Sequence, residues 1–195
     1  MAFDRINDRL EIQSVIYQYA RGVDRRDWEL VRSTYHADAW DDHGNYQGPI
    51  DGFIESLKKR HVHIEQSMHL LGNCLIDFCD DNAALVETYF STYQRLSPQA
   101  GDARLFYLRG GSVAPTDAVE GTVYGRYIDV FKLKDKAWRI SNRQVVFEVY
   151  KGATAPAGGG LPDGWMHATR DGNDPLYLAQ RKLGLYEISS RFPSV

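Results

Sequence analysis

An acid and a histidine in the first third of the chain are the residues best suited to carry chemistry. Asp24 comes where an amphipathic helix is expected to end, and His69 lies on an expected strand 45 residues later. Histidine accepts protons near neutral pH, and a carboxylate on its far ring nitrogen fixes the tautomer and stabilises the imidazolium. We therefore expect a buried base dyad that removes a proton beside a leaving group or shifts one along an enol. The alternatives are a core histidine bonded to a backbone carbonyl and a helix-end acid among arginines.

Two further residues are candidates for the same site. Arg126 shares a strand face with apolar neighbours, and a charge buried there needs a partner. It either stabilises a developing oxyanion or leaving group or forms a salt bridge to Asp24, Glu87 or another acid. Tyr19 lies on the apolar face of the first helix, where it either donates a hydrogen bond to a substrate oxygen or packs in the core.

Other polar side chains are candidates for substrate contact rather than for catalysis. For His43, the alternative is a histidine in a turn that is bonded to the backbone. The set comprises Asn73, Glu87, Tyr89, Tyr124 and His43.

Neither a metal nor a cofactor is expected. Five histidines fall within one third of the sequence, but His61 and His63 stand two apart on a helix and do not face together. No cysteine or glutamate completes a zinc set at the usual spacing. No strand is followed by a glycine-rich turn and a helix, which argues against dinucleotide and P-loop binding.

The elements that must position these residues are three helices followed by long strands. A helix is expected over 4–21, a short one after Asp27 as N-cap, and a third capped by Asp51. Alternating apolar residues then indicate strands. Helices before antiparallel strands predict an α+β fold with a curved sheet wrapped around the helices. The expected strands are 39–43, 67–78, 83–96, 104–109, 122–133 and 137–150.

The length of 195 residues fits one domain with an elaborated tail. We expect the domain to span 1–150 and a C-terminal extension to span 151–195. Residues 151–164 are rich in Gly, Ala and Pro, which predicts a mobile connection. Asp174 and Pro175 then begin a short helix that Gly184 ends. The extension is expected to dock over the pocket mouth or onto a partner subunit.

Charge and composition limit the partners. Lys and Arg number 23 and Asp and Glu number 26, a balance that argues against a nucleic-acid surface. The first eight residues carry charges where a signal peptide needs an apolar core, and no apolar run reaches membrane-spanning length. Cys74 and Cys79 lie too far apart along one expected strand to bridge. These features favour reduced thiols and a cytoplasmic protein without a membrane partner.

Several short motifs, taken together, resemble the SnoaL-like branch of the NTF2-like superfamily. The resemblance covers about residues 4–150 and implies a cone-shaped α+β barrel. The motifs are Tyr19-x4-Asp24-Arg-x-Asp27-Trp28, Tyr35-His36-x-Asp38-Ala39-x-Asp41-Asp42-His43-Gly44, His69-x3-Asn73, Glu87-Thr88-Tyr89, Gly125-Arg126-Tyr127-x-Asp129 and Trp138-Arg139-Ile140.

The resemblance also implies a function. The branch is similar to scytalone dehydratase, bile-acid 7α-dehydratase and hexachlorocyclohexane dehydrochlorinase, which implies that Asp24 supports His69 as base, with Arg126 and Tyr19 in the pocket. The expected activity is a cofactor-independent lyase or isomerase acting on a hydrophobic cyclic substrate, such as a steroid, aromatic or polyketide-like compound. The alternative is a non-catalytic ligand-binding or assembly module, such as a dioxygenase β-subunit-like protein. A homodimer or homotrimer is expected in either case.

Overall fold

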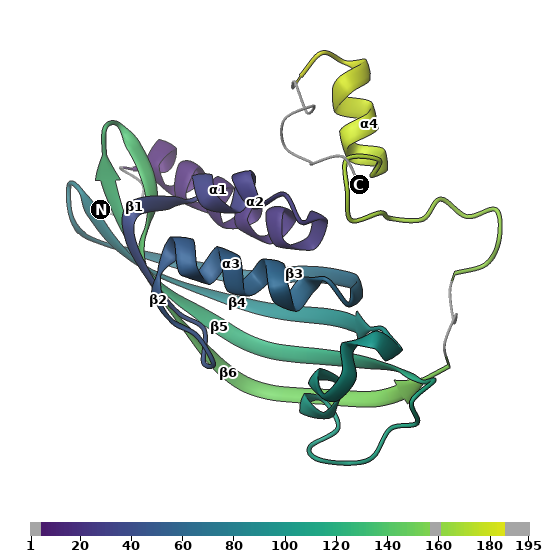
Figure 1. Ribbon diagram of the computed structural model, residues 1–195. Helices are drawn as coiled ribbons and strands as arrows, with labels where there is room; N and C mark the ends of the chain where they lie inside the picture. The colour runs from purple at the N-terminus through teal and green to yellow at the C-terminus, as the bar shows by residue number, and fades with distance from the viewer. Residues whose placement is uncertain (1–4, 157–160, 186–195) are drawn as a thin grey trace.

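Three helices lie on one side of a curved sheet in the computed structural model, which describes residues 5–156 and 161–185 (Figure 1). The helices are α1 (Ile6–Arg25), α2 (Trp28–Ser33) and α3 (Ile50–His61). Asp27 caps α2 as predicted, because its side chain accepts a hydrogen bond from the Leu30 amide. No helix in the described part of the chain is both long and apolar enough to cross a membrane.

The sheet has six strands in the order β2-β1-β6-β5-β4-β3. All neighbours are antiparallel except β1 and β6, which run parallel. The sheet is curved, and it is open rather than closed because β2 and β3 lie at its two edges. The α+β fold predicted from the sequence is confirmed. The strand bounds are β1 (Tyr35–Asp42), β2 (Gln47–Pro49), β3 (Ile64–Asp80), β4 (Ala83–Leu96), β5 (Ala118–Lys134) and β6 (Ala137–Ala155).

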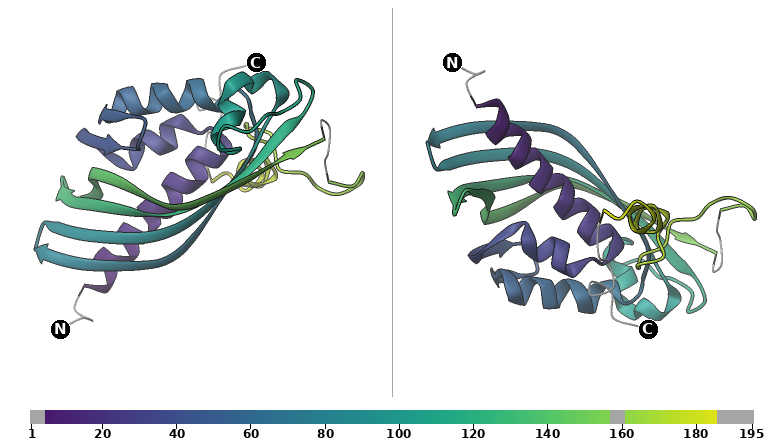
Figure 2. Two further views of the ribbon diagram at one scale, coloured as in Figure 1. Left: turned by 90° about the horizontal axis from the view of Figure 1, so that it is seen from below. Right: turned by 90° about the horizontal axis from the view of Figure 1, so that it is seen from above.

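The core lies between the helices and the concave face of the sheet (Figure 2). Side chains alternate along each strand, so in β5 the residues Val123, Tyr127 and Phe131 are buried against the helices. From α1, a stripe that includes Ile12 and Ile16 packs into the same core. Each such side chain contributes roughly 1.5–3 kcal/mol on burial, which fixes α1 across the sheet.

The opposite face of the sheet carries exposed apolar side chains. They come from four neighbouring strands and include both aliphatic and aromatic residues. The set is Met68, Leu70, Leu75, Leu85, Tyr89, Tyr124 and Val149.

Several predicted boundaries are wrong. Helix α1 continues to Arg25, and α3 begins after Pro49 without a side-chain cap, while Asp51 pairs with Arg32 instead. The expected strand 104–109 is replaced by the 3-10 helix η1 (Pro98–Phe106). The ring of Tyr107, directly after η1, lies where a side chain at Gly121 would stand, so packing against β5 overrides the strand-like sequence.

The C-terminal extension returns to the helical side of the sheet. Residues 151–155 continue β6, so the part of the 151–164 connection before residue 156 is strand, and residues 157–160 and 186–195 lie outside the described residues. The helix α4 (Pro175–Lys182) begins with Asp174 as its N-cap, as predicted. It lies near the C-terminal end of α1 (Figure 2), and the Tyr177 hydroxyl donates to Asp27 at 3.2 Å.

Candidate active site

The last turn of α1 presents Asp24 to the sheet. The helix ends there because Arg26 adopts a left-handed conformation, with φ of 57°. A side chain at Gly22 would approach Val31 of α2 to 2.7 Å, so glycine lets the two helices cross closely at this point. Their junction fixes the direction in which Asp24 points.

The edge strand β3 supplies the histidine. Ser67, His69 and Leu71 alternate with the exposed Met68 and Leu70, so the first three side chains face α1. Pairing of β3 with β4 sets this register. A residue two positions from His69 therefore shares its face, a signal that would have identified Ser67 from the sequence.

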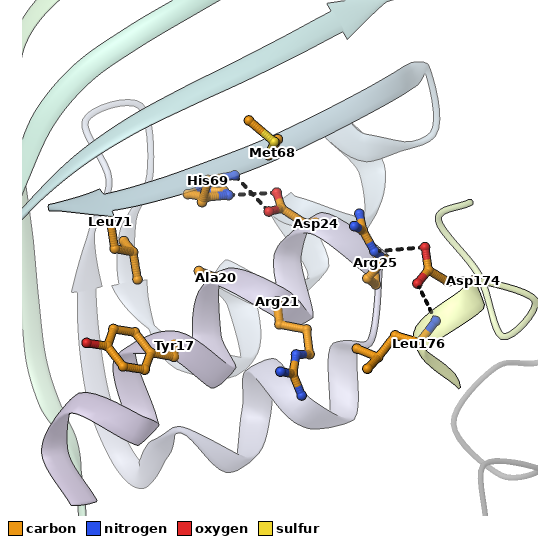
Figure 3. A pocket seen from close by; sticks show the side chains of 10 residues that line it. All are labelled: Tyr17, Ala20, Arg21, Asp24, Arg25, Met68, His69, Leu71, Asp174 and Leu176. Atoms are coloured by element: carbon orange, nitrogen blue, oxygen red, sulfur yellow. Dashed lines mark hydrogen bonds and ion pairs between the residues drawn. The ribbon is translucent and has the colours of Figure 1, made fainter. Parts of the chain in front are cut away.

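Asp24 and His69 form a direct contact, as predicted (Figure 3). The His69 Nδ1 and the Asp24 Oδ1 are 2.7 Å apart. The Ser67 hydroxyl donates to the same oxygen at 2.8 Å, and the His69 backbone amide donates to Oδ2 at 2.7 Å. Only 7% of the His69 side chain and 10% of the Asp24 side chain are exposed. These bonds fix the position of the imidazole relative to the strand that carries it.

The electrostatics keep Asp24 ionised. Burial pushes the pKa of Asp24 upward, but attraction to His69 and the hydrogen bonds from His69 and Ser67 outweigh burial, and the net pKa is lowered. An ionised Asp24 is only an acceptor, so the hydrogen of this contact lies on the Nδ1 of His69, which donates to the carboxylate. The Nε2 atom of His69 then has a free lone pair, and no hydrogen bond to it occurs among residues 5–156 and 161–185.

A cleft of about 530 Å³ opens beside this pair. It lies along the seam between α1 and β3, and residues near the start of α4 border it (Figure 3). The cone interior is a different place, filled in the described structure by buried aromatic and charged side chains. The cleft is lined by Tyr17, Ala20, Arg21, Asp24, Arg25, Met68, His69, Leu71, Asp174 and Leu176.

Arg170 of the C-terminal extension ties the surroundings of the dyad together. Its guanidinium donates to the carbonyl oxygens of Val23 and Asp24 at 3.1 and 2.8 Å, and to that of Ile64 at 2.6 Å. It also contacts the His61 Nδ1 at 2.7 Å. One side chain thus joins the end of α1, the end of α3 and the start of β3. Sequence reasoning missed this residue because no local pattern links it to α1.

Arg126 lies on the outer face of the sheet, so the prediction that it lines the pocket with the dyad is wrong. Its guanidinium pairs with Glu87 at 2.7 Å and Glu148 at 2.7 Å, and 28% of its side chain is exposed. The alternative prediction for Arg126, a salt bridge to Glu87, is the one that the structure shows. Glu87, Tyr89 and Tyr124 share this outer face, and Tyr89 and Tyr124 line a separate groove that contains neither Asp24 nor His69.

The remaining predicted residues also lie outside the cleft. Tyr19 is 1% exposed and packs edge-on against Tyr35 and Tyr127 in the core, where burial raises its pKa. Asn73 is exposed where β3 shifts register. His43 bonds to the Asp41 carboxylate at 3.0 Å rather than to the backbone. Tyr19 and His43 thus serve packing in the cone interior, whereas Asn73 is exposed on β3.

A buried charged cluster in the cone interior was not predicted. Arg143 is completely buried and forms two hydrogen bonds to Asp129, at 2.7 and 2.6 Å. Its guanidinium lies 4.1 Å from the ring centres of both Tyr19 and Tyr127. Asp129 and Arg143 stand opposite each other on β5 and β6, a pairing that the sequence would have revealed only with the inner face known. Within residues 5–156 and 161–185, no group of three or more His, Cys, Asp and Glu side chains is arranged to hold a metal ion.

The family model of the SnoaL-like domain matches residues 4–144 of the chain. Among curated proteins, none matches the chain in sequence.

Solved structures of other proteins share the fold of this chain. A protein named as a scytalone dehydratase, from Novosphingobium aromaticivorans, has a TM-score of 0.62 at 16% identity, covering 83% of this chain and 100% of its own. The hexachlorocyclohexane dehydrochlorinase LinA type 2 has a TM-score of 0.61 at 17% identity, covering 85% and 100%. A protein named as an aromatic ring hydroxylase, also from N. aromaticivorans, has a TM-score of 0.60 at 23% identity, covering 76% and 94%. At these identities the likeness establishes the fold alone.

Proposed function

Because this chain belongs to the SnoaL-like domain family, we propose that it is a cofactor-independent lyase or isomerase with His69 as its base. The observation that carries the proposal is the 2.7 Å contact between His69 Nδ1 and Asp24 Oδ1 beside an open cleft. The names of the related structures, a scytalone dehydratase and a hexachlorocyclohexane dehydrochlorinase, support a reaction of this class.

The proposed reaction begins with a carbon-bound proton of the substrate. The Nε2 of His69 takes that proton, while Nδ1–H remains hydrogen-bonded to Asp24 and the carboxylate stabilises the imidazolium. The proton then returns to another carbon in an isomerisation or leaves with the departing group in an elimination. Apolar side chains of the cleft, such as Tyr17, Leu71 and Leu176, suit a hydrophobic cyclic substrate of the steroid, aromatic or polyketide-like kind.

The test is deuterium incorporation from heavy water into steroid and aromatic ketones, followed by mass spectrometry. We expect His69→Ala to slow exchange by roughly 10²–10⁴-fold, the range for a general base. Added imidazole should restore part of the rate by occupying the vacated space. His63→Ala is the matched control, because His63 is exposed and does not line the cleft. Exchange by His69→Ala at the wild-type rate would refute the proposed role.

A non-catalytic binding or assembly module is the second candidate. Two observations favour it: the cone interior is filled by side chains such as Tyr127 and Arg143, and the outer face of the sheet exposes apolar residues. That face supports the proposal of a homodimer or homotrimer, which sedimentation equilibrium would refute by giving the mass of one chain. If no ketone exchanged deuterium while the protein still bound ligands, the module would replace the enzyme as the preferred function.

A further inference from the structure

One wall of the cleft is a stripe of residues on α1. Tyr17, Arg21 and Arg25 are four apart in sequence, so their side chains lie on one face of the helix. Ala20 and Asp24 form a second, more deeply buried row beside them. In Figure 3 the Arg21 side chain extends from α1 away from the strand that carries His69, although both residues line the cleft. A ligand along this seam would contact the stripe and the imidazole together.

The ionised side chains that line the cleft are Asp24, Asp174, Arg21 and Arg25, two of each sign, and they differ in whether each one has a partner. Asp24 is hydrogen-bonded to β3, and Asp174 pairs with Arg25 at 3.1 Å. Arg21 is exposed and has no hydrogen bond or ion pair within the described residues. Arg21 is therefore the one ionised side chain of the cleft whose polar atoms are all available to a ligand within the described residues.

Several arginines surround the cleft, although Asp24 acts against their charge and the chain carries a net charge of −3. Burial and then the charge of Arg26 lower the pKa of Arg170 to about 9. Burial, followed by Arg60 and Arg170, holds the pKa of His61 well below its usual value. Nearby arginines thus contribute to both shifts. A positive potential at a cleft raises the local concentration of anions.

We propose that the cleft binds a compound with an apolar ring system and an anionic group, a carboxylate or a phosphate, held by Arg21. The ring would lie against Tyr17, Leu71 and Leu176, with a ring carbon beside His69. This inference rests on the proposed function for the identity of the reacting residue, and it adds that the substrate is amphipathic rather than wholly apolar.

Binding of matched ligands tests the proposal. Isothermal titration calorimetry compares 2-naphthoate with 2-naphthalenemethanol, which share a ring system and differ in charge. We expect the carboxylate to bind about three- to fivefold more tightly, the effect of one partly exposed ion pair, and the preference to weaken as salt is added. The arm with 2-naphthyl phosphate shows which anionic group the cleft prefers.

Substitutions assign the preference to Arg21. Arg21→Met keeps most of the side-chain bulk and should abolish the preference for the anion, while Arg21→Lys should retain part of it. Arg139→Met is the matched control, because Arg139 is an exposed arginine on β6 outside both clefts. It makes the same change in net charge and should leave the preference intact.

Several results would overturn the proposal. Equal affinity for the two ligands, absence of naphthoate binding, or an unchanged preference in Arg21→Met would each do so. Ligand-induced changes in amide chemical shifts should fall on 17–25 and 67–71, and changes confined to Tyr89 and Tyr124 would place the ligand in the outer groove and refute the site. Arg21-dependent binding without deuterium exchange in any substrate would refute the proposed activity and leave this inference standing.

Discussion

Two aspartate–histidine pairs in this molecule share their bonding geometry and differ in their surroundings. In one, His69 Nδ1 lies 2.7 Å from Asp24 Oδ1; in the other, His43 Nδ1 lies 3.0 Å from Asp41 Oδ1. The first pair joins α1 to the edge strand and borders a cleft of about 530 Å³. The second pair comes from β1 and the turn that follows it, and it faces the cone interior.

The second pair borders neither cleft and packs against aromatic rings, and we call it the enclosed pair on that ground. The His43 ring stacks on Phe53 at a centroid distance of 4.7 Å, and neither cleft described above is lined by it. Burial lowers the pKa of His43, partly offset by the hydrogen bond and charge of Asp41. The comparison teaches that the distance between a carboxylate and an imidazole does not distinguish a base from a structural contact. The exposed fraction does not distinguish them either, since it is 13% for the His43 side chain and 7% for the His69 side chain; the difference is that His69 lines a cleft and His43 does not.

The largest expected effect comes from removing the cation near the enclosed pair. Arg143→Met leaves Asp129, which is fully buried, without its partner. We expect a loss of about 3–5 kcal/mol in the free energy of unfolding, because a buried charge without its partner is costly. Urea denaturation measures it.

The double variant Arg143→Met/Asp129→Leu removes both charges and should recover most of the stability. It tests whether the loss comes from the uncompensated carboxylate or from altered packing. If the free energy of unfolding of Arg143→Met were within about 1 kcal/mol of the wild-type value, Arg143 would not be needed to stabilise the cone interior. The contrast between the two pairs would then lose its basis.

Residue spacing made a contact between Asp24 and His69 plausible, and the resemblance to the SnoaL-like branch implied that the two residues pair. Helical periodicity placed Asp24 at the end of α1, and strand alternation placed His69 on one face of β3. Both signals are local, and the fold brings the two elements together. The same signals gave the α+β order of the chain, since helices and long strands differ in their apolar period.

Spacing could not identify the inner face of β5. Alternation correctly put Arg126 with Ile128 and Val130, but that set faces outward, and the inner set contains the charged Asp129. Hydrophobicity therefore favoured the wrong face, because an ion pair with Arg143 compensates the buried acid. Arg170 was beyond prediction for another reason: its carbonyl acceptors lie more than 100 residues away.

A smaller effect on stability is expected from removing the hydroxyl groups that donate to the two aspartates. Ser67 donates to Asp24 at 2.8 Å, and Tyr35 donates to Asp41 at 2.8 Å. Ser67→Ala and Tyr35→Phe each remove one hydrogen bond to a charged group, which should cost about 1.5–3 kcal/mol of stability. Only Ser67→Ala should also slow deuterium exchange, since only Asp24 orients the proposed base. Equal slowing by both variants would argue against a distinction between the pairs.

The smallest expected effect is a difference in how the pairs respond to acid. The pKa of His43 is lowered by burial from its usual 6.5, so below pH 6.5 the unfolded chain binds a proton there that the folded chain does not. Stability therefore falls as the pH drops from 6.5 toward the folded pKa. His61 adds a shift of the same sign. The pKa of Asp24 is lowered from 3.8, so its contribution is present above pH 3.8 and is lost only as the pH falls through its folded value.

Urea denaturation between pH 7 and pH 5 separates these contributions. His43→Asn keeps an N–H donor for Asp41 and removes the titrating ring, so it should lose less stability than wild type over this range. The difference is expected to be at most about 2 kcal/mol, the limit set by the 1.5 pH units between 6.5 and 5. The Asp24 carboxylate should contribute equally at both pH values, because both lie above 3.8. An identical pH dependence in His43→Asn and wild type would mean that His43 is protonated in the folded state, and the enclosed pair would then be a charged one.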